Sequence, residues 1–550
     1  MAAVASTPVA VASTPRGRWL FGPLSDLMLG CGLAYLIVLV VLSLAGAETR
    51  ALLPPGLLAL GALVTGMPHY GATLLRVYER REDRRAYAIF AVWATLLIAT
   101  AFVVGARYAA VASVLFTIYV TWNAWHYTGQ NYGISLMFLG RRGVAVAPTE
   151  KRLVYATFVL SYLIILVSIH GGGGAGYAPQ AQDGWVVRFM PLGIPDGIGD
   201  IALGGLAAAY VAALIGAAVL LRRRAASWRD LGPAALLVAV QAAWFVLPTL
   251  ARASGTFQGI EPLSQHYADY AFYWVAYAHS IQYLWITTYY ARARDPQLGR
   301  VSFFWKALLA GTALWGIPAL LFAPQALGAL PYGGGLVLLV AATVNIHHFM
   351  LDGAIWKLRD GRIARILLRS ELAKAPAPRP GRSFARPLIW AAGAVCAAIF
   401  VLDTWERRVG YAEALARQDS DRMQTAVRRL GWVGRDEADL HYRLAVLLAT
   451  QQRVSEAITH LERSIEREPS APAWTGLAEM HEVRGEWRQA AKAYDQALTL
   501  APDHVPALQR SGELLLQLGQ TASARARLEK ALALDPANPY TAQALRTAGG

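Results

Sequence analysis

Long apolar stretches constrain the fold of this chain more than any other feature. Eleven segments are long and apolar enough to cross the roughly 30 Å hydrocarbon core of a bilayer. Backbone groups in hydrocarbon must be satisfied within the segment itself, so stretches of this kind fold as helices. We therefore predict an all-α polytopic membrane helix bundle over residues 24–403. The expected spans are residues 24–46, 52–75, 86–105, 109–139, 153–170, 200–221, 232–250, 266–290, 303–323, 331–356 and 387–403.

Positively charged residues set the expected orientation of the bundle. A net charge of +15 would suggest a nucleic-acid partner for a soluble protein, but here Arg and Lys gather in short loops between the apolar segments. With alternating spans, these basic loops all fall on one face, which the positive-inside rule assigns to the cytoplasm. We therefore expect no nucleic-acid partner and a location in the bacterial inner membrane. The N-terminus is expected in the cytoplasm and the C-terminal domain outside it.

The N-terminal residues and the cysteines add little about function. Residues 1–15 are small residues interrupted by prolines, with no basic segment ahead of an apolar core, so we expect residues 1–23 to be a disordered cytoplasmic tail and not a cleaved signal peptide. Cys31 and Cys396 both fall within expected spans. Two isolated cysteines make neither a disulfide framework nor a thiolate metal site.

A period of about 34 residues begins after residue 403, where the long apolar stretches stop. This period resembles that of tetratricopeptide repeats, which stack helical pairs into an α-solenoid with a concave binding surface. The resemblance covers residues 437–550 and implies a protein or peptide partner; residues 404–436 are expected to be a linker or a degenerate helical pair. The copies are marked by Leu444, Ala445, Ala457, Leu461 and Pro469, by Trp474, Leu477, Ala478, Gly485, Ala490, Tyr494, Ala497 and Pro502, and by Leu508, Gly512, Gly519, Ala524, Leu528, Ala531 and Pro536.

Histidines inside the apolar stretches are the main clue to function. Ionisable side chains are costly in a bilayer, so they usually face the interior of a bundle and mark a metal, a redox group, a proton path or a substrate. Counting from the first basic residue on the cytoplasmic side places these histidines between about 10 and 22 Å from the inner interface. The residues are His69, His126, His279, and the adjacent pair His347 and His348.

Polar residues one helical turn away favour a metal site, because residues four apart share a helix face. Asp352, four residues after His348, can bind a metal, orient an imidazole or handle a proton. Imidazole with carboxylate suits iron, zinc or copper, and open positions suit non-haem iron acting on oxygen. Adjacent helix positions are about 100° apart, so His347 and His348 cannot both face one ion. The predicted ligands are His69, His126, His279 and His347 or His348, with the i+4 neighbours Thr73, Gln130, Tyr283 and Asp352.

Two short motifs add a family resemblance. Gly-Met-Pro-His-Tyr-Gly at residues 66–71 and Trp-His-Tyr-Thr-Gly at residues 125–129, followed by later intramembrane histidines, resemble the histidine motifs of membrane-embedded carotene-cleaving dioxygenases. The resemblance implies that the same histidines hold a non-haem iron, which works with dioxygen on a polyene. The chain departs from the family pattern where Gln130 and Asn131 replace the acidic residue expected after the second motif, and it carries an added repeat domain.

Three other hypotheses stay open. Two haems would use His266 and His279, thirteen residues apart on one expected helix, with His170 and His126 as partners. A membrane glycosyltransferase would need acidic residues in an early outside loop, where the chain offers only Glu48. A non-enzymatic envelope assembly or transport protein would use the repeats to recruit a partner. The hypothesis that we favour is a metal-dependent oxidoreductase acting on a lipid-like or polyene substrate.

Overall fold

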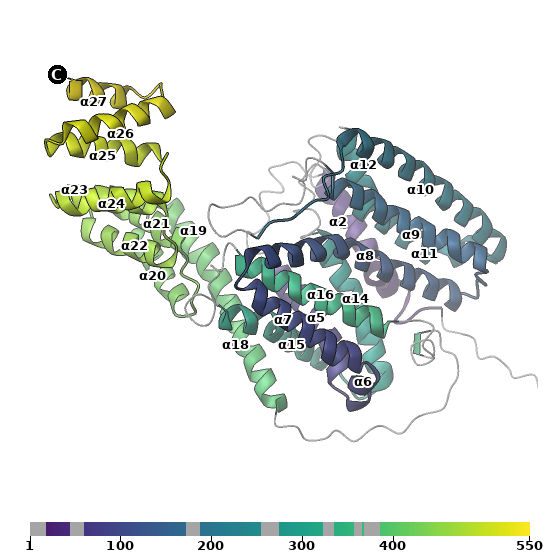
Figure 1. Cartoon of the computed structure of the whole chain (residues 1–550). Helices are drawn as coiled ribbons and strands as arrows, with labels where there is room; N and C mark the ends of the chain where they lie inside the picture. The colour runs from purple at the N-terminus through teal and green to yellow at the C-terminus, as the bar shows by residue number, and fades with distance from the viewer. Residues whose placement is uncertain are drawn as a thin grey trace, which may run out of the picture. The chain divides into compact units, whose positions relative to one another are not determined.

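The structure is a computed structural model that describes residues 18–44, 60–171, 187–254, 274–322, 335–356, 366–367 and 385–549. Within these ranges the chain is all-helical, apart from one isolated backbone bridge between Gly171 and Ile194. The chain divides into two compact units, which are described separately (Figure 1). Of the described residues, those from 18 to 322 and from 335 to 397 belong to the first unit, and those from 398 to 549 belong to the second.

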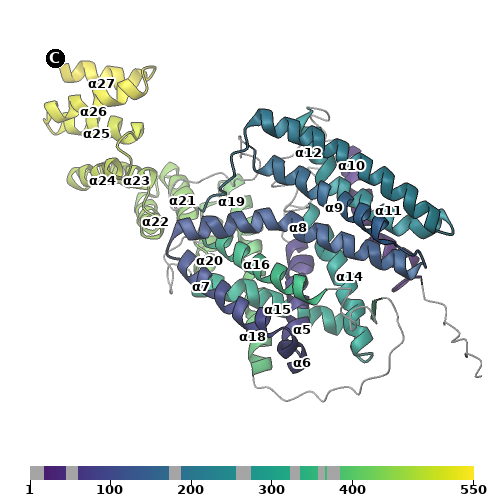
Figure 2. The ribbon, with the colours of Figure 1, turned by 45° about the vertical axis from the view of Figure 1, so that its right-hand side comes forward.

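The first unit is a helix bundle built around one long helix, α8 (Ala109–Arg141). Helix α8 packs against α16 (Val337–Ile355) and α11 (Trp228–Gln241), and it lies alongside α16 in both views (Figure 1 and Figure 2). The other long helices of this unit are α2 (Leu33–Leu44), α5 (Met67–Tyr78), α7 (Thr95–Gly105), α9 (Pro148–Ile169), α10 (Asp196–Arg224), α14 (Ala276–Arg294) and α15 (Arg300–Leu321). Helix α18 (Ala385–Trp405) follows, and its last residues belong to the second unit.

Five described helices are long and apolar enough to cross a membrane, or six if a pair bent by 59° at Pro23–Gly30 and Leu33–Leu44 counts as one span. They correspond to the expected spans that begin near residues 24, 153, 200, 232, 303 and 331. Two other expected spans, 52–75 and 266–290, lie partly outside the described residues. The bundle therefore contains apolar helices of membrane-spanning length, and the number eleven stays a prediction.

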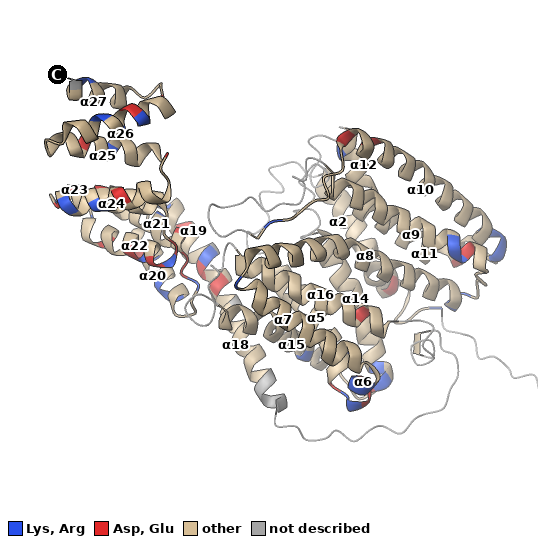
Figure 3. Cartoon of the chain, in the orientation of Figure 1, with Lys and Arg blue, Asp and Glu red and all other residues tan. Residues whose placement is uncertain are grey.

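Exposed apolar side chains distinguish this bundle from the surface of an ordinary water-soluble domain. In α10 only 11% of the most apolar window is buried, and Ile201 is 80% exposed. Large contiguous apolar surfaces of this kind mark contact with another protein or with a membrane. Charged residues gather near helix ends, for example at α6 (Arg81–Ala86) and where α10 leads into α11 (Figure 3).

The helix that carries His69 is held by a close backbone crossing. A Cβ atom added at Gly71 of α5 would overlap the carbonyl oxygen of Ala307, and one added at Gly311 of α15 would overlap that of Met67. Small residues spaced four apart allow helix backbones to approach this closely. The crossing therefore fixes α5 against α15.

An ion-pair cluster fixes the opposite end of α5. Asp83 of α6 lies 3.1 Å from Arg76 of α5 and 2.8 Å from Arg294 of α14. The carboxylate of Asp83 is buried. Losing one of its guanidinium partners would leave an uncompensated buried charge, so the pairs hold the three helices in fixed positions. The cluster ties together two of the helices that carry histidines.

The second unit is a stack of helical pairs, as the 34-residue period predicts. Residues with positive φ, Gln418, Gln452, Gly485 and Gly519, recur at the turn within each pair and are spaced 34, 33 and 34 residues apart. The first pair lies at residues 406–431, in the segment expected to be a linker or a degenerate pair. The helices are η7 (Glu406–Tyr411) with α19 (Ala412–Ala416), α20 (Ser420–Gly431), α21 (Ala438–Thr450), α22 (Val454–Arg467), α23 (Ala471–Val483), α24 (Trp487–Leu500), α25 (Val505–Gln517), α26 (Thr521–Leu534) and α27 (Pro539–Gly549).

Small buried residues let the helices of each pair cross closely. Ala478, Ala490 and Ala497 have no exposed surface, and they surround the ring of Tyr494, which is also fully buried. The Tyr494 hydroxyl donates a hydrogen bond of 2.6 Å to Glu482. The alanine and tyrosine signature positions of the sequence are therefore core positions of the solenoid.

We predict that Gly311→Val destabilises the helix bundle by about 1–3 kcal/mol or more, because the new side chain overlaps the backbone of α5. Thermal unfolding of the detergent-purified protein measures this change. Gly204→Val is the matched control, since a Cβ at that exposed helical glycine of α10 meets no heavy atom within 4 Å. Equal stability of the two variants would contradict the close crossing.

Candidate metal centre

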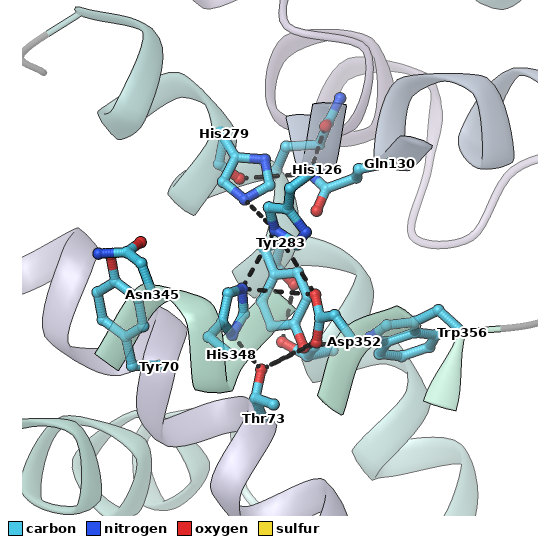
Figure 4. A network of polar contacts seen from close by, with 12 residues as sticks. Tyr70, Thr73, His126, Gln130, His279, Tyr283, Asn345, His348, Asp352 and Trp356 are labelled. Carbon is cyan, nitrogen blue, oxygen red and sulfur yellow. Dashed lines mark hydrogen bonds and ion pairs between the residues drawn. The ribbon is translucent and has the colours of Figure 1, made fainter. Parts of the chain in front are cut away.

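Four of the five predicted histidines converge at one point inside the helix bundle. His69 comes from α5. His126 comes from α8, His279 from α14 and His348 from α16, and these three rings are labelled in Figure 4. One ring nitrogen of each lies within 4.8 Å of those of the other three. His69, His279 and His348 are buried, while His126 lies at the edge of a cavity. The centre thus joins four helices that are distant in sequence.

One imidazole nitrogen of the cluster has two nitrogen neighbours at hydrogen-bond distance. The Nε2 atom of His126 lies 3.2 Å from Nε2 of His279 and 3.2 Å from Nε2 of His348. A neutral imidazole nitrogen carries either one proton or one in-plane lone pair, so it forms one good hydrogen bond and not two. A cation placed among the three nitrogens would accept a lone pair from each.

The hydroxyl of Thr73 holds the far side of the His348 ring. Its oxygen lies 3.0 Å from Nδ1 of His348, and it donates a hydrogen bond of 3.1 Å to Oδ1 of Asp352. If Nδ1 of His348 donates to Thr73, the Nε2 lone pair points at the other histidines, which is the tautomer that a metal ligand needs.

The ring of His69 closes the cluster from the side of α5. Its ring centre lies 4.3 Å from that of His348 and 4.9 Å from that of His279. Its Nδ1 atom is buried and has no hydrogen-bond partner among the described residues. A buried nitrogen without a partner costs free energy, and a bound ion is one way to satisfy it.

Asp352 presents one oxygen to the histidines and uses the other for hydrogen bonds. Its Oδ1 accepts from Thr73 and, at 2.5 Å, from the hydroxyl of Tyr283. Its Oδ2 lies 3.5 Å from Nε2 of His348 and 3.8 Å from Nε2 of His126. The carboxylate is therefore oriented by Thr73 and Tyr283 so that Oδ2 can bind a metal or exchange a proton.

A second layer of hydrogen bonds holds these groups in place. The indole of Trp356 donates a bond of 3.1 Å to the hydroxyl of Tyr283. On the other side, Gln130 donates to the side-chain oxygen of Gln282. The side-chain nitrogen of Gln282 donates to the carbonyl oxygen of Gly30 at 2.9 Å. These contacts connect α8, α14 and the bent segment near Gly30 around the histidines.

His347 lies apart from the cluster. Its Nε2 atom is 2.9 Å from the hydroxyl of Thr95 on α7, and its ring stacks against that of Tyr78 at a centre-to-centre distance of 6.4 Å. The 100° between adjacent helix positions separates it from His348. Of the adjacent pair, His348 alone joins the four-histidine cluster.

A cavity of about 290 Å³ adjoins the cluster. His126, Tyr283 and Asp352 form its polar end, and its remaining wall is aromatic or apolar except for Gln130 and three glycines. Ligand pockets are commonly about 300–1,000 Å³, with a few polar groups in a mostly apolar wall. The other lining residues are Trp122, Trp125, Gly129, Gly133, Ile134, Met137, Ile286, Phe349, Gly353, Trp356 and Leu367.

Trp356 belongs to the network around Asp352 although the sequence did not single it out, while two polar residues near the histidines make other contacts. Trp356 lies four residues after Asp352, a spacing that could have singled it out, but tryptophans near the end of an apolar helix are usually interface anchors. Asn131 donates to Gln241 at 2.8 Å, and Asn345 accepts from Tyr70 at 2.9 Å, so both amides belong to other contacts.

The haem and glycosyltransferase hypotheses named further residues, and of these the structure describes His170. His170 is held locally: its Nε2 lies 3.0 Å from the hydroxyl of Thr121, and its Nδ1 accepts from the backbone of Leu192. His266 of the haem hypothesis and Glu48 of the glycosyltransferase hypothesis lie outside the described residues.

Two histidines of the repeats contact each other, although their sequence spacing is not that of a metal site. Nδ1 of His441 lies 2.9 Å from Nδ1 of His460, and Nε2 of His441 lies 3.2 Å from Asp436. Asp436 also accepts from Arg467 at 2.8 Å. Burial and the neighbouring His441 lower the pKa of His460 to about 4.

Comparisons with known proteins identify the C-terminal part of the chain. Residues 411–472, 442–505 and 484–548 match family models described as tetratricopeptide repeats. The chain thus ends in tetratricopeptide repeats, which form a protein-interaction module. These matches cover about a quarter of the chain and do not assign a family to the bundle.

No curated protein matches the chain. Among solved structures, the crystal structure of the APC/C hetero-tetramer Cut9-Hcn1 aligns with 88% of this chain and 99% of that chain, at 14% identity and a TM-score of 0.21. A TM-score this low carries no argument. The comparisons do not support the resemblance to carotene-cleaving dioxygenases, which stays a hypothesis.

We predict that the repeat unit loses stability as the pH falls from about 6.5 towards 4. The unfolded chain takes up a proton at His460 near pH 6.5 while the folded chain does so near pH 4, so protons favour the unfolded state in that window. Urea unfolding of residues 398–550, followed by circular dichroism at several pH values, measures this slope. His460→Gln should flatten it, and an unchanged slope in that variant would refute the assignment.

Proposed function

We propose that the four-histidine cluster binds one transition-metal ion, with non-haem iron as the first choice, and that the bundle is an oxidoreductase. The observation that carries this proposal is the convergence of four imidazole nitrogens within 4.8 Å inside an apolar bundle. Four helices each bring a polar group to one buried point, and such groups in apolar helices usually serve a function.

The spacing of the nitrogens supports a single small ion. Ligand atoms bound tetrahedrally at about 2.1 Å lie roughly 3.4 Å apart, close to the 3.2 Å between His126 and each of its two neighbours. The ligand set of four imidazoles and one nearby carboxylate suits iron, zinc or copper. Convergence on one point favours a single ion over haem, because a porphyrin separates its two axial ligands by a flat macrocycle.

His69, His126, His279 and His348 would hold the ion. When bound, iron at such a site supplies one-electron redox chemistry and reactivity towards dioxygen. Asp352 holds a proton or releases it at Oδ2, beside His126 and His348. Tyr283 and Thr73 keep that carboxylate in place through Oδ1.

The adjoining cavity is the proposed substrate site. It opens directly onto His126 and Asp352 and is otherwise mostly apolar, which supports a lipid-like or polyene substrate. Its walls also shield the centre from bulk water, which strengthens electrostatic interactions inside it.

The bundle is proposed to lie in the bacterial inner membrane, with its N-terminus in the cytoplasm and the repeats outside. Apolar helices of spanning length, the exposed apolar face of α10 and the clustering of charges near helix ends support this placement. The repeats would bind a protein or peptide of the envelope. An envelope assembly or transport role would rest on the same repeats alone, without the histidines.

We predict that replacing any one of His69, His126, His279 or His348 with Ala removes most of the bound metal. Elemental analysis of detergent-purified protein, with an absorption spectrum to detect haem, measures the metal content. Loss of one of four ligands should weaken binding by more than the 10–100-fold typical of a change in an outer hydrogen-bond partner.

His347→Ala is the matched control, because His347 neighbours His348 in the chain but faces Thr95. It should keep the metal of the unmodified protein. Retention of full metal in the four variants, or equal loss in His347→Ala, would contradict the proposed centre.

We also predict that Asp352→Asn lowers the affinity for Co²⁺, used as a spectroscopic probe, by about 10–100-fold, because the charge beside two ligands is lost. A titration followed by visible absorption gives the dissociation constant. Tyr283→Phe should weaken binding less, since the carboxylate keeps its charge and its bond from Thr73. An unchanged affinity in Asp352→Asn would exclude this role of the carboxylate.

A further inference from the structure

Three glycines in the wall of the cavity have no packing reason to be glycine. A Cβ atom added at Gly129 or Gly133 of α8, or at Gly353 of α16, would meet no heavy atom within 4 Å. This contrasts with Gly71 and Gly311, where the same addition overlaps a neighbouring backbone. Glycine inside a helix costs about 1 kcal/mol relative to alanine, so each of the three lowers helix stability without allowing a closer helix contact.

The missing side chains leave open space in the cavity. Gly129 and Gly133 are one helical turn apart, so they line the same face of α8 as His126 and Met137. Gly129 and Gly353 are also exposed, which means that the cavity reaches the surface of the bundle beside α8 and α16. The opening therefore lies on the flank of two helices.

The chemistry of the wall points to an uncharged ligand. Among the described residues that line the cavity, Asp352 is the one with a charged side-chain type, and it lies at the end formed with His126. Rings of Trp122, Trp125, Phe349 and Trp356 line the cavity along with the glycines. A charged group in this apolar part would lose its hydration without gaining a partner.

We propose that the cavity binds one uncharged hydrocarbon chain, which enters from the side past Gly129 and Gly353 and ends next to His126 and Asp352. The proposal rests on the proposed function for what happens to the chain there, but chain binding itself requires no metal. Gly129, Gly133 and Gly353 set the width of the groove. A cavity of about 290 Å³ does not admit a second helix, which is about 10 Å across with its side chains.

The test is photolabelling of the full-length, detergent-purified protein with a neutral C16 alkyl diazirine, mapped by mass spectrometry. Labelling at residues 122–137 and 349–356 should saturate with probe and be competed by hexadecane. Labelling of the exposed apolar helix α10 should rise linearly and serves as the internal reference for non-specific contact. No saturable labelling at the cavity would overturn the proposal.

Variants connect the labelling to the glycines. Gly133→Leu and Gly129→Leu should lower the saturable labelling at least fivefold, and Gly133→Ala should lower it less. Gly204→Leu on α10 is the matched control and should leave it unchanged, since it adds the same side chain at an exposed helical glycine with open space around it. Unchanged labelling in the two cavity variants would refute the groove.

Metal analysis of the same samples separates this inference from the proposed function. Saturable labelling in a protein that binds no metal would support the chain site and contradict the metal centre. Metal binding without saturable labelling would support the metal centre and contradict the chain site. A Gly133→Leu protein that keeps its metal but loses its labelling shows that the variant is folded and that the groove is blocked.

Discussion

The structure of the bundle depends on the cost of placing polar side chains inside apolar helices. Four imidazoles and a carboxylate cannot be left without partners there, so they must satisfy one another or a bound ion. The contacts among His126, His279 and His348 satisfy this only in part, because Nε2 of His126 lies 3.2 Å from Nε2 of each of the other two rings and forms one good hydrogen bond, not two. Asp352 is under the same constraint. Thr73 and Tyr283 donate hydrogen bonds to its Oδ1 atom, and its Oδ2 atom is directed at the histidines.

Glycines have two different structural roles in this bundle. Gly71 and Gly311 let α5 and α15 approach until their backbones are in contact, which fixes the helix that carries His69. Gly129, Gly133 and Gly353 are surrounded by open space and shape a cavity next to the histidines. One residue type thus contributes both to the rigidity of the centre and to access to it. A buried centre with a lateral opening suits a substrate that dissolves in hydrocarbon.

The repeats are stabilised in a different way, by contacts between neighbouring helical pairs. Positive φ recurs in the turns of all four described pairs, from Gln418 to Gly519, although only the last two turns use glycine. The pair at residues 406–431 keeps the backbone of a repeat while its sequence has diverged. This explains why the first pair was hard to recognise from signature residues alone.

The helical class, the repeats and a set of candidate histidines could be predicted from the sequence alone. Apolar length, a 34-residue period and histidines at similar depth are properties of the chain that can be read without coordinates. The sequence could not decide which of His347 and His348 faces the cluster, nor that Trp356 supports Tyr283. The choice between the two histidines depends on the rotation of α16 and on contacts of His348 with residues more than 200 positions away, while the bond from Trp356 to Tyr283 joins two helices that are 73 positions apart at this contact. The cavity likewise exists only through packing, because an empty space belongs to no single segment. Tertiary structure therefore decided the geometry, since side chains from four helices share a site only after the helices pack.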